Sequence, residues 1–235
     1  MIALLAAAAM FASPAPAMLR RGGELYSLHC LNCHGTALQG TVQGPPLVRA
    51  GAAAVDFQLS TGRMPVDVPG TEPMRGPPSF PRAEINALIA YVATHAAGPT
   101  IPAVHESHDL TRGRKLFEAN CQACHGAIGT GAVAGFGWLA PSVLQSTPLQ
   151  TAEAVRTGPG IMPKFGEHVM PQADLDALVA YTDTLHRPDD RGGYSLASAG
   201  PVGEGLMAWI VGLGFTIIVM LAVGETLAKK PPTSP

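Results

Sequence analysis

Apolar residues lie together on one predicted helical face in two matched pairs of segments. Leu25 and Tyr26 precede one cysteine-rich motif, and Leu116 and Phe117 precede a second. Such residues are expected to form the buried face of a helix. The segments that close the two halves share a similar pattern and span residues 85–91 and 175–181. The pattern predicts an all-α chain with two similar halves.

The two halves are copies of one unit. Arg21-Gly22 and Arg112-Gly113 lie 91 positions apart (112 − 21), as do Cys30 and Cys121 (121 − 30). In the closing segments the offset is 90 (175 − 85), so only small loop changes separate the copies. Self-similarity at a fixed period indicates an internal duplication. We therefore expect two tandem domains.

A long, strongly apolar run without charged residues lies near the C-terminus. Leu206–Gly224 contains 19 consecutive residues without a charge, which is the length of a transmembrane helix. Trp209 suits a membrane interface, and Lys229 and Lys230 suit the cytoplasmic end. We expect a single anchor in the cell membrane, a cytoplasmic C-terminus, and both domains on the extracytoplasmic side.

The N-terminal residues resemble a processing segment. Ile2–Ala12 is an apolar run, and Ala15-Pro16-Ala17 resembles a small-residue cleavage site. No positive charge precedes the run, which is too short to span a bilayer alone. We favour a signal peptide; an N-terminal anchor is the alternative if the native N-terminus is longer.

Glycine and proline mark the boundaries between the predicted parts. Gly98-Pro99 starts a linker, and Arg187-Pro188 starts a second connector. The predicted organisation is a signal-peptide-like or apolar segment (1–17), domain 1 (18–98), a linker (99–109), domain 2 (110–187), a connector (188–204), a transmembrane helix (205–228) and a cytoplasmic tail (229–235).

The charge pattern excludes one class of partner. Charged residues make up 14% of the chain and its net charge is −2, so no basic surface indicates nucleic acid. Lys115 and Lys164 are the only lysines before the C-terminal tail. Long-range steering of a diffusing partner is therefore expected to be weak, which suits partners held in a fixed complex.

The chain's four cysteines form two copies of Cys-x-x-Cys-His. These are Cys30, Cys33 and His34, then Cys121, Cys124 and His125. Cysteines three apart on a helix share one face, so both thiols can reach the vinyl groups of one porphyrin. The histidine that follows can ligate the iron. The motif predicts two covalently bound haem c groups.

Two other uses of Cys-x-x-Cys fit less well. A thioredoxin-like redox site requires a βαβ setting, which neither motif has. A zinc ribbon usually places about 15–20 residues between its two cysteine pairs, far fewer than separate Cys33 from Cys121. Neither explains a histidine after both second cysteines.

Two methionines in matched settings are candidates for the sixth iron ligand. Met64 and Met162 both follow a Thr-Gly pair and directly precede proline, which favours extended backbone in the residue before it. A methionine ligand makes haem iron an electron carrier of raised potential. Met74 and Met170 have no counterpart in the other half, and Met170 is expected to pack at the entry to the closing helix.

Other residues are assigned supporting or structural roles. The carbonyls of Pro45 and Pro141 are candidates to hold the second ring N–H of each proximal histidine. His105 and His108 lie in the linker, where a metal site is a minor alternative. The histidines interpreted as surface or packing residues are His29, His95, His105, His108, His168 and His186.

Each half resembles a class I cytochrome c domain, with a helix, the haem motif, a Gly-Pro loop, Met-Pro and a closing helix. The whole chain is similar to the di-haem cytochrome c subunit of the actinobacterial cytochrome bcc complex (menaquinol:cytochrome c reductase). The segments that carry this resemblance are residues 44–47, 60–65, 140–143, 157–158, 162–165 and 201–210.

The resemblance implies an electron relay in a respiratory supercomplex. In that family a Rieske iron–sulfur protein, reduced by quinol at the cytochrome b subunit, passes electrons to one haem of this subunit. The other haem delivers them to a terminal cytochrome c oxidase. By position, we expect domain 2 to receive electrons and domain 1 to deliver them.

The sequence is also compatible with other functions. The chain is expected to be an enzyme only as an electron-transfer subunit, without substrate chemistry of its own. The alternatives are an electron-transfer subunit of a periplasmic dehydrogenase or of another oxidase, and a di-haem peroxidase. A peroxidase needs a vacant or exchangeable sixth position, whereas each half offers a methionine.

Overall fold

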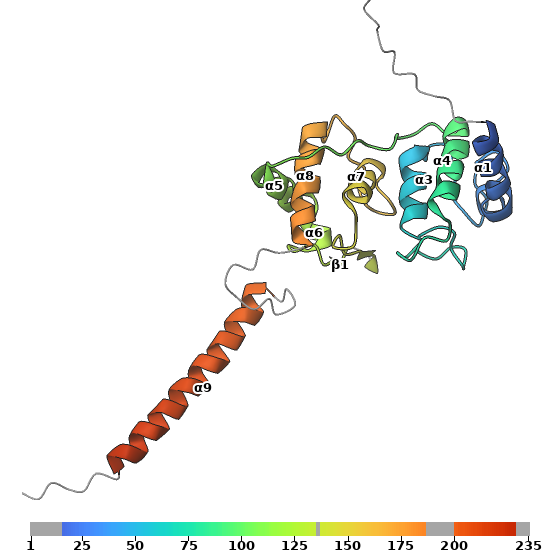
Figure 1. The fold of residues 1–235 in the computed structure, drawn as a ribbon. Coiled ribbons are helices and arrows are strands. Elements are labelled where there is room, and N and C mark those ends of the chain that lie inside the picture. The colour runs from blue at the N-terminus through green and yellow to red at the C-terminus, as the bar shows by residue number, and fades with distance from the viewer. Residues whose placement is uncertain (1–15, 135–136, 187–199, 229–235) are drawn as a thin grey trace, which may run out of the picture. The chain divides into compact units, whose positions relative to one another are not determined.

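The computed structural model describes residues 16–134, 137–186 and 200–228 (Figure 1). It divides into two compact units, Met1–Arg187 and Pro188–Pro235. The N-terminal segment before residue 16, most of the second connector and the tail 229–235 lie outside the described residues. Helix α1 begins at Pro16, so the expected boundary after residue 17 falls inside a helix. Proline is favoured at a first helical position because its φ is already helical.

The larger unit contains two helical repeats. Repeat 1 (16–98) consists of α1 (Pro16–His29), α2 (Leu31–His34), α3 (Gly51–Ser60) and α4 (Arg82–His95). Repeat 2 (110–186) consists of α5 (Leu110–Asn120), α6 (Gln122–His125), α7 (Pro148–Thr157) and α8 (Gln172–Leu185). The described residues are predominantly helical, as the sequence predicts.

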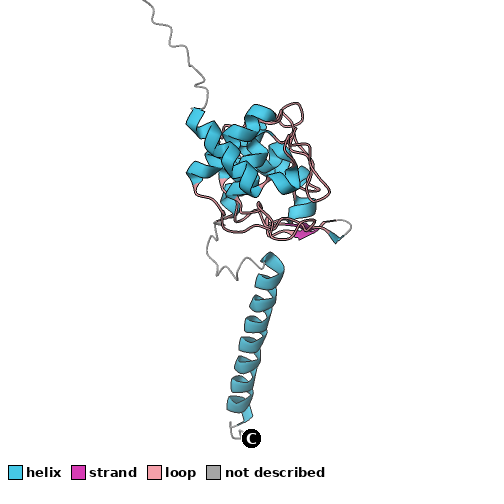
Figure 2. Cartoon of the chain, turned by 90° about the vertical axis from the view of Figure 1, so that its right-hand side faces the viewer, coloured by secondary structure: helices cyan, strands magenta, loops and turns pink. Residues whose placement is uncertain are grey.

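The structure also contains a short β-hairpin, which the sequence did not predict. Strands β1 (Ala132–Val133) and β2 (Leu139–Ala140) pair antiparallel, with Ala132 opposite Ala140. Pairing satisfies backbone groups in the loop that follows α6. Figure 2 shows this hairpin in magenta beside the pink loops, below the cluster of cyan helices.

In both repeats the first helix crosses the closing helix at a glycine. A Cβ on Gly22 would overlap the carbonyl oxygen of Ala87 and lie 2.7 Å from Cβ of Tyr91. A Cβ on Gly113 would meet the equivalent atoms of Ala177 and Tyr181 in the same way. The repeated Arg-Gly pair of the sequence therefore marks a close backbone contact.

An ion pair accompanies each crossing. Arg21 contacts Glu84, and Arg112 contacts Asp174 through two hydrogen bonds of 2.9 and 2.7 Å. These pairs are partly exposed, so they are expected to contribute little to stability. They do show that the α1–α4 and α5–α8 packing is preserved between the copies.

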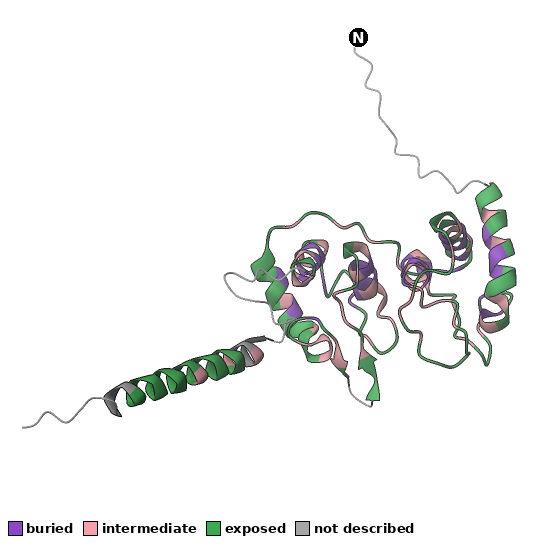
Figure 3. Ribbon diagram, turned by 60° about the horizontal axis from the view of Figure 1, so that its bottom comes forward, coloured by how far each residue is buried: buried purple, intermediate pink, exposed green. Residues whose placement is uncertain are grey.

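Each repeat has its own hydrophobic core between these helices, visible as the purple faces in Figure 3. Tyr26 and Leu88 are buried in repeat 1, and Phe117 and Leu178 occupy the core of repeat 2. The apolar helix faces expected from the sequence thus point inward.

The repeats contact each other through α3 and α7, which lie side by side in Figure 1. The Arg75 guanidinium donates to the carbonyl of Gln145 at 2.5 Å and to Oε1 of Gln150 at 2.8 Å. The Gln150 amide also donates to the hydroxyl of Ser60 at 3.3 Å. We call this contact the α3–α7 interface.

The smaller unit contains helix α9 (Gly200–Ala228). Its segment Gly205–Glu225 is long and apolar enough to cross a membrane, and none of it is buried within the protein. Large apolar side chains such as Trp209 and Met220 are exposed along it. A fully exposed apolar helix of this length is typical of a membrane span rather than a soluble core helix.

We predict that Gly22→Ala and Gly113→Ala each destabilise the repeat that contains them. The added methyl group must displace a backbone carbonyl, and overpacking of this kind costs about 1–3 kcal/mol. Thermal unfolding of the haem-loaded protein measures the effect. Gly166→Ala is the matched control, because a Cβ there meets nothing within 4 Å. Equal melting temperatures for all three variants would contradict this account of the crossing.

Candidate haem-binding sites

Each cysteine motif occupies one helical turn that continues from the first helix of its repeat. The amide of Cys30 donates to Tyr26 O at 2.9 Å, and the amide of His34 donates to Cys30 O at 2.9 Å. In repeat 2 the matching bonds join Cys121 to Phe117 and His125 to Cys121, both at 2.8 Å. The first helices therefore fix where both motifs lie.

The turn ends at a glycine in both motifs. Gly35 and Gly126 follow the histidines with φ of +80° and +77°. This left-handed backbone suits glycine and reverses the chain after one turn. In repeat 1 the Tyr26 hydroxyl donates to the carbonyl of Gly35 at 2.7 Å, which ties the turn to the core.

Each motif histidine contacts a proline carbonyl. Nδ1 of His34 lies 2.8 Å from the carbonyl oxygen of Pro45, and Nδ1 of His125 lies 2.9 Å from that of Pro141. A carbonyl accepts only from a protonated nitrogen, so Nδ1 carries the proton in both rings. The lone pair then lies on Nε2, which can bind a metal.

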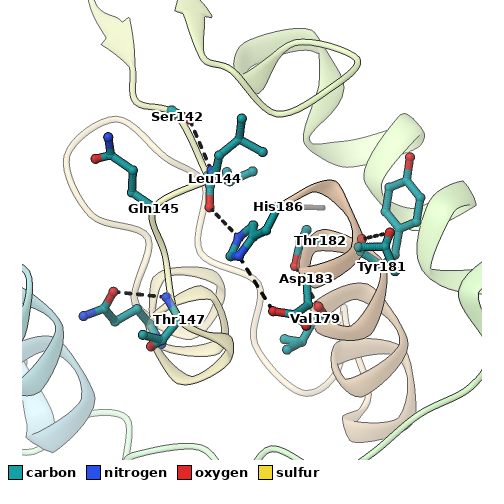
Figure 4. A network of polar contacts seen from close by, with 12 residues as sticks. Ser142, Leu144, Gln145, Thr147, Val179, Tyr181, Thr182, Asp183 and His186 are labelled. Carbon is teal, nitrogen blue, oxygen red and sulfur yellow. Dashed lines mark hydrogen bonds and ion pairs between the residues drawn. The ribbon is translucent and has the colours of Figure 1, made fainter. Parts of the chain in front are cut away.

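Hydrogen bonds around the loop in repeat 2 hold the segment after Pro141. The Ser142 hydroxyl accepts from the amide of Leu144 at 3.2 Å, and Nε2 of His186 lies 3.3 Å from the carbonyl of Val143. Figure 4 shows His186 reaching from the end of α8 toward this loop. His186, interpreted from the sequence as a surface or packing residue, thus links the loop to the closing helix.

All four cysteines are free and partly buried. Burial, with a smaller effect of the neighbouring Cys33, raises the pKa of Cys30 to about 11. Burial and Cys124 raise the pKa of Cys121 to about 11 in the same way. Reactive redox thiols have lowered pKa values. Neutral thiols disfavour the thioredoxin-like alternative.

Met64 and Met162 pack against the same cores as the motif cysteines. Met64 and Cys30 border the repeat 1 core, and Met162 and Cys121 border the repeat 2 core. Both methionines are partly buried.

The competing methionines have other environments. Met74 is 62% exposed, and Met170 is 2% exposed within the repeat 2 core. Met170 therefore packs at the entry to α8, and Met74 lies on the surface.

Arg156 is buried and Arg63 is partly buried, and neither was predicted from the sequence as a site residue. Nη1 of Arg63 and Nη2 of Arg156 are buried without a hydrogen-bond partner among the described residues. Burial lowers the pKa of Arg63, and the charge of Arg75 lowers it further. A buried N–H group without a hydrogen-bond partner is unfavourable, so each of these two nitrogens favours an added acceptor such as a carboxylate.

The repeat pattern concealed these arginines because they occupy different places in it. Arg63 follows Thr61-Gly62, whereas Arg156 precedes Thr157-Gly158. An arginine next to Thr-Gly in both halves was the sequence feature that could have identified them.

The residues present fit haem c. In each repeat, two thiols are available for thioether bonds and one histidine has Nε2 available for the iron. One nitrogen without a hydrogen-bond partner is available in each repeat, on Arg63 or on Arg156, and it suits a propionate carboxylate of the haem in that repeat. When bound, each haem supplies an iron that exchanges one electron. The protein's residues attach, orient and enclose it.

The remaining histidines show no metal cluster. Among the described residues, no three His, Cys, Asp or Glu side chains lie close enough to hold a metal ion. His105 instead contacts Asp176, with Nδ1 3.0 Å from the carboxylate and its amide donating at 3.1 Å. This contact fastens the linker to α8.

Comparisons with known proteins agree with the geometry. Residues 19–96 match the family described as cytochrome c, and residues 108–181 match the family described as cytochrome C oxidase, cbb3-type, subunit III. Two helical units with Cys-x-x-Cys-His turns define a di-haem c-type cytochrome.

Curated relatives identify one family within the c-type cytochromes. The cytochrome bc1 complex cytochrome c subunit of Mycobacterium tuberculosis is 36% identical and aligns with 88% of this chain and 78% of its own length. The Corynebacterium diphtheriae protein of the same name is 30% identical, with coverages of 89% and 81%. The chain belongs to the actinobacterial family of cytochrome bc1 complex cytochrome c subunits.

A more distant relative shares part of the chain. Thiosulfate dehydrogenase of Stutzerimonas stutzeri is 27% identical over 48% of this chain and 43% of its own length.

Membership establishes the basic properties of the protein. It is an electron-transfer cytochrome of the bc-complex type with two c-type domains, which bind haem c covalently. The apolar helix α9 indicates a membrane anchor.

We predict that Arg156→Gln destabilises repeat 2. The Arg156 guanidinium donates to the carbonyls of Phe165 at 3.1 Å and Met170 at 2.6 Å, on the segment that follows Met162. Each buried carbonyl left unsatisfied costs about 1–3 kcal/mol. Urea unfolding followed by haem absorbance measures the loss. Arg114→Gln, which removes an exposed pair with Glu118, should leave the midpoint unchanged. Equal midpoints for Arg156→Gln and wild type would contradict the prediction.

Proposed function

We propose that the protein relays electrons through two haems, each ligated by histidine and methionine. His34 and Met64 ligate one iron, and His125 and Met162 ligate the other. The supporting observation is the repeated arrangement of the site. In both repeats, Nδ1 of the motif histidine contacts a proline carbonyl, at 2.8 and 2.9 Å, which leaves Nε2 for the iron. The carbonyls of Pro45 and Pro141 keep each ring oriented.

The α3–α7 interface supports electron exchange between the repeats. Helix α3 leads directly into the loop that carries Met64, and α7 leads into the loop that carries Met162. Both loops therefore start at the surface that joins the repeats. The interface residues contact one another directly, through Arg75, Gln150 and Ser60.

We further propose that the chain works between the Rieske protein and a terminal oxidase. The cytochrome b subunit and the Rieske iron–sulfur subunit of the same complex are its partners, and repeat 2 receives the electron. Repeat 1 delivers it to a terminal cytochrome c oxidase. Membership of the bc1-complex family, the membrane-type helix and the few lysines support this assignment.

The proposed orientation follows from the ends of the apolar segment. Lys229 and Lys230 place the C-terminus in the cytoplasm by the positive-inside rule. The haem domains then lie on the extracytoplasmic side of the cell membrane, and the span 205–225 anchors them in the lipid bilayer.

A subunit of a periplasmic dehydrogenase is the second candidate. The partial match to thiosulfate dehydrogenase favours a dehydrogenase subunit over a di-haem peroxidase. A dehydrogenase subunit, like a bc-complex subunit, would transfer electrons without substrate chemistry of its own. Co-purification in mild detergent separates the two candidates. Recovery of cytochrome b and Rieske subunits supports the relay, and recovery of a dehydrogenase subunit contradicts it.

We predict that Met64→His and Met162→His each lower the potential of one haem. Methionine ligation raises the potential relative to a second nitrogen ligand. Each substitution should also remove one of two methionine–iron charge-transfer bands, measured by absorbance during a redox titration. Met74→Leu and Met170→Leu are the controls and should retain both bands. Loss of a band in a control variant would mean that the ligand has been misassigned.

The order of the two haems is testable in the purified complex. Met162→His should slow reduction of both haems by quinol, whereas Met64→His should leave reduction of the repeat 2 haem intact. Stopped-flow absorbance resolves the two haems. If Met64→His blocks both haems and Met162→His does not, electrons enter through repeat 1.

A further inference from the structure

Two acidic side chains are buried where the repeats meet. Asp56 on α3 is 1% exposed and Glu153 on α7 is 0% exposed. The function described above uses neither residue. Each helix leads into the loop with a proposed methionine ligand. Asp56 precedes Met64 by 8 residues (64 − 56), and Glu153 precedes Met162 by 9 residues (162 − 153).

Only one of the two carboxyl groups has a cation. The Arg82 guanidinium donates to both oxygens of Asp56, at 2.5 and 2.8 Å, so this pair is neutral overall. Neither side-chain oxygen of Glu153 has a hydrogen-bond partner among the described residues. A buried carboxylate in that state is strongly disfavoured.

The other charged groups on the neighbouring elements have contacts elsewhere, and the Arg63 guanidinium lies over the Phe57 ring, 4.9 Å from its centroid. Arg75 contacts Gln150, and Arg156 donates to two backbone carbonyls. On α8, Asp174 pairs with Arg112 and Asp176 pairs with His105. Arg82 is therefore the cation that faces Glu153, and both of its contacts go to Asp56.

A proton resolves this imbalance. A protonated Glu153 can donate a hydrogen bond to the Asp56 carboxylate, which two ionised carboxylates cannot form. Burial, followed by the charge of Asp56 and the hydrogen bond that only a protonated Glu153 can donate to it, raises the pKa of Glu153 to about 9 against a smaller opposing effect of Arg82. Glu153 is thus neutral at physiological pH.

We propose that Glu153 is a redox-linked proton-binding site at the α3–α7 interface. An oxidised haem iron carries one more positive charge than a reduced iron, so oxidation favours the Glu153 carboxylate. At alkaline pH, where part of Glu153 is ionised, transfer of one electron from the donor to a bound haem would favour uptake of one proton from solvent by the Glu153 carboxylate, and oxidation would favour release of that proton. The partly exposed side chain of Arg82 marks the solvent side of the cluster.

The sign of the pH dependence follows. Near pH 7 Glu153 is protonated in both redox states, and the potentials are independent of this group. As pH rises through about 9, the carboxylate forms and favours Fe(III), so the haem potentials fall. The proposal requires haem in the repeats but does not depend on which partners donate or accept electrons.

Redox titration of the full-length haem-loaded protein in detergent, from about pH 6 to about pH 11, tests the proposal. In wild type, at least one potential should fall across the alkaline range. Glu153→Gln has the shape of the protonated side chain and should remove that fall while leaving the potentials at pH 7 unchanged. Glu118→Gln, at an exposed carboxyl paired with Arg114, should behave as wild type. The methionine–iron bands, recorded in the same titration, identify any pH effect that arises from loss of a ligand.

Two results would overturn the proposal. One is a wild-type potential that does not change with pH, and the other is a Glu153→Gln protein with the wild-type fall. If Glu153→Gln does not fold, the reduced-minus-oxidised infrared spectrum of wild type at about pH 9 decides. A carboxylic acid band gained on reduction supports the proposal, and the absence of such a band refutes it.

Discussion

The close crossing of the first and last helices in each repeat determines where the haem site lies. Gly22 and Gly113 bring two helix backbones so near that a Cβ has no room. The first helix continues into the Cys-x-x-Cys-His turn, and the closing helix supplies the other side of the core. Motif, proline loop and methionine loop are therefore arranged around one helix pair, whose close crossing at a glycine recurs in both copies.

Duplication preserved the haem scaffold but not the surface between the copies. With Thr61 matched to Thr157, the offset is 96 (157 − 61), and Glu153 then occupies the position of Phe57 (153 − 96). An acid replaces an aromatic residue where the repeats meet, beside the Arg82–Asp56 pair. The interface is therefore polar, and the two helices contribute different residues to it. Arg82 balances the charge of Asp56, so a neutral interface requires a proton on Glu153. Changes of this kind allow two haems on equivalent scaffolds to have different environments.

The sequence predicted the local elements well because the haem motif and the helix faces are encoded by short-range spacing. The paired repeats, Cys30 and Cys121 turns and the apolar C-terminal helix all follow from such spacing, and the relationship to curated cytochromes confirms the class. The sequence did not reveal the α3–α7 interface, the partly buried Arg63 or the buried Glu153. These features depend on residues far apart in the chain, such as Arg75 and Gln150, which only the folded structure brings together.

The proposed electron relay requires haem bonded to both cysteine pairs, and the mass of the denatured full-length protein tests this directly. We expect a mass that exceeds that of the polypeptide by two haem groups. After digestion, one haem should remain on the peptide with Cys30 and Cys33 and one on the peptide with Cys121 and Cys124. A mass equal to that of the bare polypeptide, or haem attached at only one motif, would contradict the central claim.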